Sequence, residues 1–141
     1  MAEDRWLVIP SDRFWTKQAG ASKESLLRLR AAAPIELPAK YYDLLAFSDG
    51  GEGPLRTQPL WFQLYSVDYA VEMFGRGLND EFFPGFLFFG SSGGGEGIAF
   101  DARKPGLLPI VSIDWIDADL NESVWLVAPD FDAFLDLVGL E

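Results

Sequence analysis

Hydrophobic residues recur along this chain with two different periods, which predict helices toward both ends and strands between them. Phe131, Phe134 and Val138 fall on one face of a helix, which predicts a C-terminal helix over 130–138 capped by Asp130. Toward the other end, the pattern predicts a helix over 23–32 capped by Ser22, a helix over 39–48 that begins after Pro38 and stops at the glycines 50–51, and a short helix capped by Ser66.

Strand patterns occupy the middle of the chain, at 58–65, 86–90, 96–101, 107–113 and 123–127. In the first of these, Leu60, Phe62 and Leu64 alternate with Trp61 and Tyr65, so we expect the three to share one face. The predicted fold class is α+β: a single domain over 1–141, with a mainly antiparallel sheet and the end helices packed against it. We expect six large apolar side chains to be buried together: Phe62, Phe88, Phe100, Phe131, Phe134 and Leu135.

Five of the eight residues from 90 to 97 are glycine, and this segment is similar to two enzyme motifs. Gly90, Ser92 and Gly94 fit the nucleophile elbow, but the chain has no histidine to activate the serine, and a strand pattern follows where that motif needs a helix. A phosphate-binding loop is disfavoured because Glu96 would repel an anion. We therefore interpret the segment as a tight connection between two strands.

The chain contains neither cysteine nor histidine, which narrows the chemistry that it can carry. Disulfides, thiolate catalysis and zinc–thiolate sites are excluded, and the usual imidazole ligands are missing, so we expect no metal and no cofactor. The N-terminus lacks the basic and apolar regions of a signal peptide, and no apolar run approaches the ~20 residues of a membrane span. We therefore expect a cytoplasmic protein.

Charge is distributed unevenly between the two halves. Residues 1–70 hold nine acidic and eight basic side chains, a net charge of −1, whereas residues 71–141 hold thirteen acidic and three basic, a net charge of −10. Such a field repels nucleic acids and anionic membranes, and it attracts basic proteins. The pattern thus favours a basic protein partner, although acidity also serves simply to keep a protein in solution.

The strongest candidate surface is the segment 114–122, in which carboxylates stand among large apolar residues. Trp115 would anchor a partner there, while four carboxylates accept its arginines: Asp114, Asp117, Asp119 and Glu122. The alternative is a solvated acidic loop with Trp115 packed inward. A calcium loop starting at Asp117 is disfavoured, because Glu122 and Ala128 stand where glycine and a bidentate glutamate are required. Asp49, Glu52 and the glycine turn with Glu96 form a second candidate surface.

One enzymatic alternative needs no histidine, because two carboxylates and a stacking aromatic residue suffice for glycoside hydrolysis. Glu52, Glu96, Trp61 and Trp115 would have to supply these groups. Nothing in the spacing of these residues favours such a site, so we prefer a non-catalytic function over a glycoside hydrolase.

Three motifs in order resemble the SUKH superfamily, in the Smi/Knr-type branch named after the yeast regulator of cell-wall glucan synthesis. They are Leu37-Pro38 with Tyr41-Tyr42, Leu44-Leu45 and Ser48-Asp49-Gly50-Gly51; Phe88 through the glycine turn to Phe100-Asp101; and Asp130-Phe131 with Phe134-Leu135. The chain departs from the family pattern at Glu96, where Asp or Asn is more common, and in the acidic stretch 114–122.

The resemblance implies a non-catalytic protein-binding module. Bacterial members are largely immunity proteins that neutralise a cognate polymorphic toxin by direct contact, and fungal members are scaffolds in cell-wall signalling. Together with the acidic charge, the resemblance implies a basic toxin domain as the partner, and the alternative function is a regulatory scaffold in cell-wall synthesis or signalling. The family supplies no catalytic residues to transfer, and its binding surface varies between members.

Overall fold

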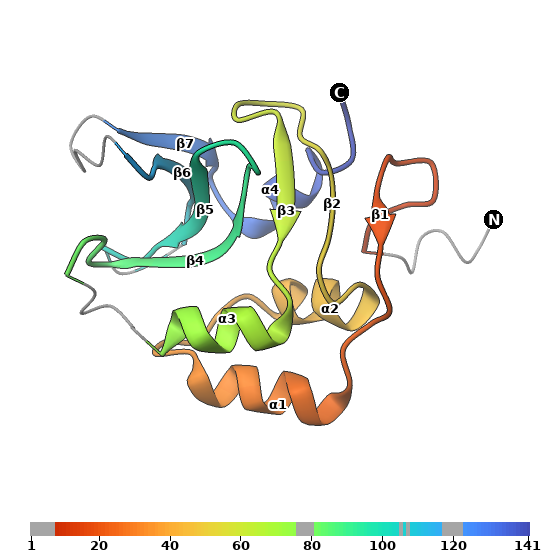
Figure 1. The fold of residues 1–141 in the computed structure, drawn as a ribbon, viewed down its shortest axis with the longest axis horizontal. Coiled ribbons are helices and arrows are strands. Elements are labelled where there is room, and N and C mark those ends of the chain that lie inside the picture. The colour runs from red at the N-terminus through yellow and green to blue at the C-terminus, as the bar shows by residue number, and fades with distance from the viewer. Residues whose placement is uncertain (1–7, 76–80, 105, 107, 117–122) are drawn as a thin grey trace.

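The computed structural model describes residues 8–75, 81–104, 106, 108–116 and 123–141, shown in Figure 1. Along the chain the elements are β1 (Thr16–Lys17), α1 (Lys23–Ala32), α2 (Ala39–Phe47), β2 (Gly51–Pro54), β3 (Trp61–Leu64), α3 (Val67–Phe74), β4 (Phe86–Ser91), β5 (Glu96–Asp101), β6 (Ile110–Asp114), β7 (Val124–Ala128) and α4 (Phe131–Leu135). The α+β class predicted from the sequence is confirmed.

The strands form one seven-stranded sheet in the order β1-β2-β3-β4-β5-β6-β7, and every neighbouring pair is antiparallel. Each strand therefore pairs with the strand that follows it along the chain. The sequence did not predict β1 and β2, because β1 has two residues and β2 reads Gly-Glu-Gly-Pro, a composition typical of a turn.

Side-chain caps begin three of the helices at the predicted residues. The hydroxyls of Ser22 and Ser66 accept from backbone N–H groups of α1 and α3, and Asp130 does the same for α4. α1 and α3 lie side by side beneath the sheet (Figure 1), where Arg28 forms an ion pair with Asp68.

The last helix is shorter than predicted. It ends at Leu135, and Val138 instead forms an isolated antiparallel bridge with Leu55, just after β2. Val138 is still fully buried. The helical spacing of the apolar residues therefore predicted its burial correctly but placed the end of the helix too late. The same region receives the N-terminal segment: Arg13 Nη1 donates to the Val138 carbonyl at 2.7 Å, and Phe14 N donates to Gly139 O at 3.0 Å.

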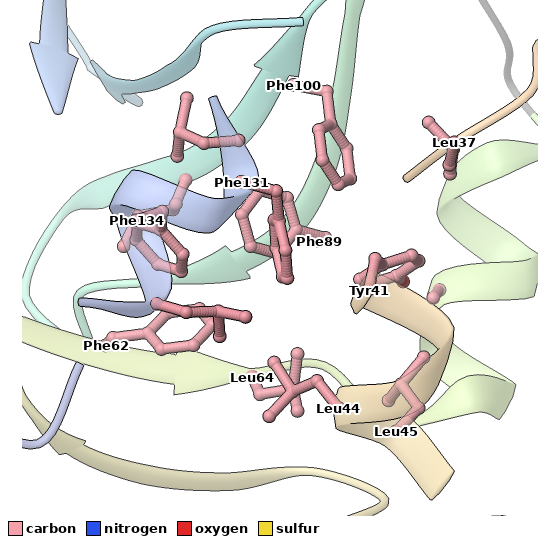
Figure 2. Close-up of a cluster of buried hydrophobic side chains, with 14 of the residues drawn as sticks. Leu37, Tyr41, Leu44, Leu45, Phe62, Leu64, Phe89, Phe100, Phe131 and Phe134 are labelled. Atoms are coloured by element: carbon pink, nitrogen blue, oxygen red, sulfur yellow. The ribbon is translucent and has the colours of Figure 1, made fainter. Parts of the chain in front are cut away.

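Most of the core lies on the inner face of the sheet, which is the face toward α2 and α4. Figure 2 shows the Tyr41 side chain of α2 directed at Phe89 and Phe131, with Phe62 beside Phe134. The centroids of the Phe62 and Phe134 rings are 4.9 Å apart, and their planes are nearly perpendicular. Five of the six side chains predicted to be buried together belong to this core: Phe62, Phe100, Phe131, Phe134 and Leu135.

Phe88 is the exception, and the prediction for it was wrong. It is buried on the opposite, outer face of the sheet, in a second cluster with Phe86, Ala99, Val111 and Ile113. All four residues from 86 to 89 are apolar because β4 is covered on both faces. The sequence therefore shows no alternation of apolar and polar residues that would assign each side chain to one of the two clusters.

The strand predicted over 58–65 begins only at Trp61. Leu60 has a φ of 74° and is 56 % exposed, so it does not share the inner face with Phe62 and Leu64. It closes the turn between β2 and β3, where its N–H donates to Thr57 O and its carbonyl accepts from Leu55 N. The turn geometry therefore overrides the apolar alternation.

Candidate functional site

The glycine turn joins β4 to β5 and is organised by one buried side chain, Ser92. Its hydroxyl oxygen accepts from the backbone N–H groups of Gly94 at 3.1 Å, Glu96 at 3.3 Å and Gly95 at 3.4 Å, and it lies 3.4 Å from both carboxylate oxygens of Glu96. The strand-to-strand connection expected from the sequence is confirmed. The serine that fits the nucleophile elbow thus holds the shape of a turn.

Trp115 follows β6 and packs onto this turn. Its backbone N–H donates to Gly95 O at 2.9 Å, and its ring centroid lies 4.6 Å from that of Phe88 and 5.5 Å from that of Phe83. The ring covers Gly97, where an added Cβ would lie 2.5 Å from carbons of both Trp115 and Phe88. The structure therefore matches the inward-packed alternative for Trp115, which forms the border of the outer cluster.

Glu96 and Asp114 are brought opposite each other, as cross-strand partners of β5 and β6. Like charges at directly opposite positions of neighbouring strands repel each other. Asp114 is exposed, and its Oδ1 accepts from Ile116 N at 2.8 Å; Ile116 itself is 94 % exposed. The other three predicted carboxylates, Asp117, Asp119 and Glu122, lie outside the described residues.

The second predicted surface is only partly assembled. Glu52 Oε1 accepts from Trp61 Nε1 at 3.0 Å and from Gln63 Nε2 at 3.4 Å, and Gln63 Oε1 accepts from the Ser91 hydroxyl at 3.3 Å. These hydrogen bonds connect Glu52 to the glycine turn across β2, β3 and β4. Asp49 has another role, because its Oδ1 accepts from Val67 N at 2.7 Å at the first residue of α3.

The contacts of the four side chains considered for glycoside hydrolysis are structural. Trp61 is bonded to Glu52, Glu96 to Ser92, and Trp115 is packed on Phe88. Within the described ranges, the structure contains no group of three or more acidic, histidine or cysteine residues arranged to hold a metal ion. Among the helices described, none is long and apolar enough to cross a membrane.

Two exposed aromatic and aliphatic residues were missed by the sequence reasoning. Trp125 and Leu126 in β7 are 57 % and 60 % exposed. Leu126 pairs with Val111 of the outer cluster, whereas Trp125 pairs with Ser112, so the two side chains lie on opposite faces of the sheet. The available signal was the uncharged run Val-Trp-Leu-Val-Ala between two acidic segments.

The acidic residues are concentrated in the C-terminal part of the sequence. Residues 105–141 contain eight acidic side chains and no lysine or arginine. Just before them, Arg103 is bonded to Asp101, with an Nη2–Oδ2 distance of 2.9 Å. Burial alone would raise the pKa of Asp101, but the hydrogen bonds and charge of Arg103 outweigh burial and lower it. Asp132 is paired with Lys40 of α2 at 3.0 Å.

These features define a class of protein: a small α+β domain built on an antiparallel meander, whose serine and carboxylate groups stabilise turns and helix starts. The chain belongs to the SMI1 / KNR4 family (SUKH-1), whose family model matches residues 20–137. The match runs from just before α1 to just after α4 and confirms the resemblance seen in the sequence. Among curated proteins, none matches the chain.

Proposed function

We propose that this chain is an immunity protein that binds a cognate basic toxin domain directly and neutralises it without catalysis. The observation that carries the proposal is that acidic charge and exposed apolar side chains occur together in the C-terminal part of the chain. Residues 105–141 have eight acidic and no basic side chains, and they include Ile116, Trp125 and Leu126, which are all more than half exposed. Family membership supports a binding role of this kind.

Charge and apolar area would serve different steps of binding. Carboxylates steer a cationic partner toward the surface and raise the association rate, an effect that weakens once salt shortens the Debye length below about 10 Å. Trp125 and Leu126 are exposed on opposite faces of the β7 edge, so a partner that covers this edge would desolvate both, and such contacts govern dissociation. Asp114 and Glu96, which face each other across β5 and β6, would accept arginines at the border of this surface.

The test is co-expression with any toxin domain that is found encoded beside this gene, scored by cell survival and by pull-down. The variant neutralises three carboxylates of the predicted surface: Asp117→Asn, Asp119→Asn and Glu122→Gln. The matched control removes the same charge from three exposed positions in the other half: Asp12→Asn, Glu36→Gln and Asp43→Asn. We expect the surface variant to associate more slowly and protect less, while the control behaves as wild type.

Two results would contradict the proposal at different levels. Failure of the wild-type chain to protect against or bind that toxin would overturn the immunity function. Protection by the wild type with equal, salt-insensitive binding by both variants would retain the function but place the interface elsewhere, with Glu52 and the glycine turn the next surface to be tested.

A further inference from the structure

The two edges of the sheet are built differently. β1, at one edge, is two residues long and ends in the exposed Lys17, features that discourage pairing with another strand. β7, at the other edge, is five residues long and contains neither a charge nor a proline. Within the described residues, the side of β7 that faces away from β6 pairs with no strand.

The first half of β7 is the accessible part. Val127 and Ala128 are buried, whereas Trp125 and Leu126 are largely exposed, and they lie on opposite faces of the sheet. An added strand would therefore find main-chain donors and acceptors along the edge and a large apolar side chain on each face. This combination is the one that strand-adding interactions use, with backbone bonds for affinity and alternate side chains for specificity.

Charge determines which occupant fits this edge. A second copy of the chain would bring its own 105–141 segment, with eight acidic and no basic residues, against the first, so self-pairing is opposed. An extended segment rich in arginine or lysine would instead be attracted. Asp114 lies at the end of the neighbouring strand, and Asp130, the cap of α4, follows β7, whereas Asp132 is already paired with Lys40. Cationic side chains flanking the added strand would lie near these carboxylates.

We propose that the edge of β7 at Val124–Leu126 binds an extended cationic segment of a protein partner as an eighth strand. This inference rests on the proposed function, since it says how the basic partner is held. It requires main-chain pairing, which distinguishes it from attraction between charges alone.

The probe is a short peptide of alternating arginine and valine, compared with an arginine–proline peptide of equal charge and length and with a glutamate–valine peptide. The readout is residue-resolved amide exchange and amide NMR shifts of the full chain. We expect the arginine–valine peptide to slow exchange in β7 severalfold and to shift β7 amides saturably. The arginine–proline peptide cannot donate ladder hydrogen bonds and should give neither effect, and the glutamate–valine peptide should be repelled.

A pair of variants localises the effect. Leu126→Lys places a charge at the edge, and Leu27→Lys adds the same charge at an exposed apolar position on α1. We expect Leu126→Lys to weaken binding of the arginine–valine peptide about tenfold, because it removes apolar contact and opposes strand addition, while Leu27→Lys changes it little.

Three results would overturn the inference: equal binding of the arginine–proline peptide, shifts centred away from β7, or dimers of the chain alone that Leu126→Lys abolishes. None of them bears on whether a toxin is neutralised, which the co-expression experiment decides separately. Failure of the β7 edge and failure of the immunity function are therefore distinguishable.

Discussion

At the scale of single residues, Tyr41 is the centre of the inner core. Its ring contacts Phe89, Phe100 and Phe131 in near-perpendicular geometry, yet its hydroxyl has no hydrogen-bond partner among the described residues. Burial, and then the nearby Tyr42 and Asp49, raise the pKa of this hydroxyl above its ordinary value, so it stays neutral. A neutral polar group without a partner is still costly to bury.

We expect Tyr41→Phe to raise the free energy of unfolding by about 1 kcal/mol, because it removes an unsatisfied hydroxyl and keeps the ring contacts. Chemical denaturation of the two proteins measures the difference. Tyr69→Phe is the control, since Tyr69 is exposed on α3 and should change stability by less than about 0.5 kcal/mol. A clear loss of stability in Tyr41→Phe would show that a buried water satisfies the hydroxyl.

Asp101 and Arg103 provide the pH-dependent prediction. Asp101 has a lowered pKa, so its interaction with Arg103 stabilises the fold fully above the ordinary value of 3.8 and is lost as pH falls through the lowered value. We expect Asp101→Asn to lower Tm by a few degrees at pH 7, and the gap from wild type to shrink below about pH 4. Thermal melts of both proteins from pH 7 to pH 2 measure this difference in Tm.

The control for that prediction is Asp68→Asn. The ion pair of Asp68 with Arg28 is exposed on both sides, so its removal should cost less at pH 7 than that of Asp101. If the Tm difference between wild type and Asp101→Asn stayed constant down to pH 2, the loss of stability would come from packing and not from charge.

At the scale of elements, the outer cluster depends on the close approach of Trp115 to β5. We expect Gly97→Ala to cost about 1–3 kcal/mol, because its Cβ would lie 2.5 Å from ring carbons of Trp115 and Phe88. Trp115→Ala should cost about 2 kcal/mol or more through lost packing. In the double variant the added Cβ no longer clashes with Trp115, so the loss of stability should be smaller than the sum of the two single losses. Chemical denaturation of the wild type, both single variants and the double variant measures this difference. Strict additivity would mean that the ring does not rest on Gly97.

The sequence predicted elements best where one local interaction determines the outcome. Ser22, Ser66 and Asp130 each cap the helix assigned to them, because a cap needs only a side chain and the next three residues. Leu60 was misassigned because the turn that gives it a positive φ depends on the hydrogen bonds between β2 and β3. Phe88 was placed in the wrong cluster because nothing local shows that β4 is covered on both faces.

At the scale of the whole molecule, charge asymmetry was visible in the sequence because it is a sum that needs no coordinates. The sequence did not show which side chains lie exposed or close together in the acidic part of the chain. The approach of Glu96 to Asp114 depends on the register between β5 and β6. The exposure of Trp125 and Leu126 depends on β7 being the last strand of the sheet, whereas an uncharged run in the sequence reads as core.

The bonds that join Arg13 and Phe14 to Val138 and Gly139 set an order of events during synthesis. Each strand of the meander can pair with the next one as soon as both have left the ribosome, and the longest separation between such partners is that of Thr16 and Glu52. Arg13 and Phe14 are made long before residues 135–139, so their bonds to the carbonyls there form late, as does the bridge of Leu55 to Val138. This early-made segment is thus among the last to reach its place, and a nascent chain leaves this side of its core uncovered until then.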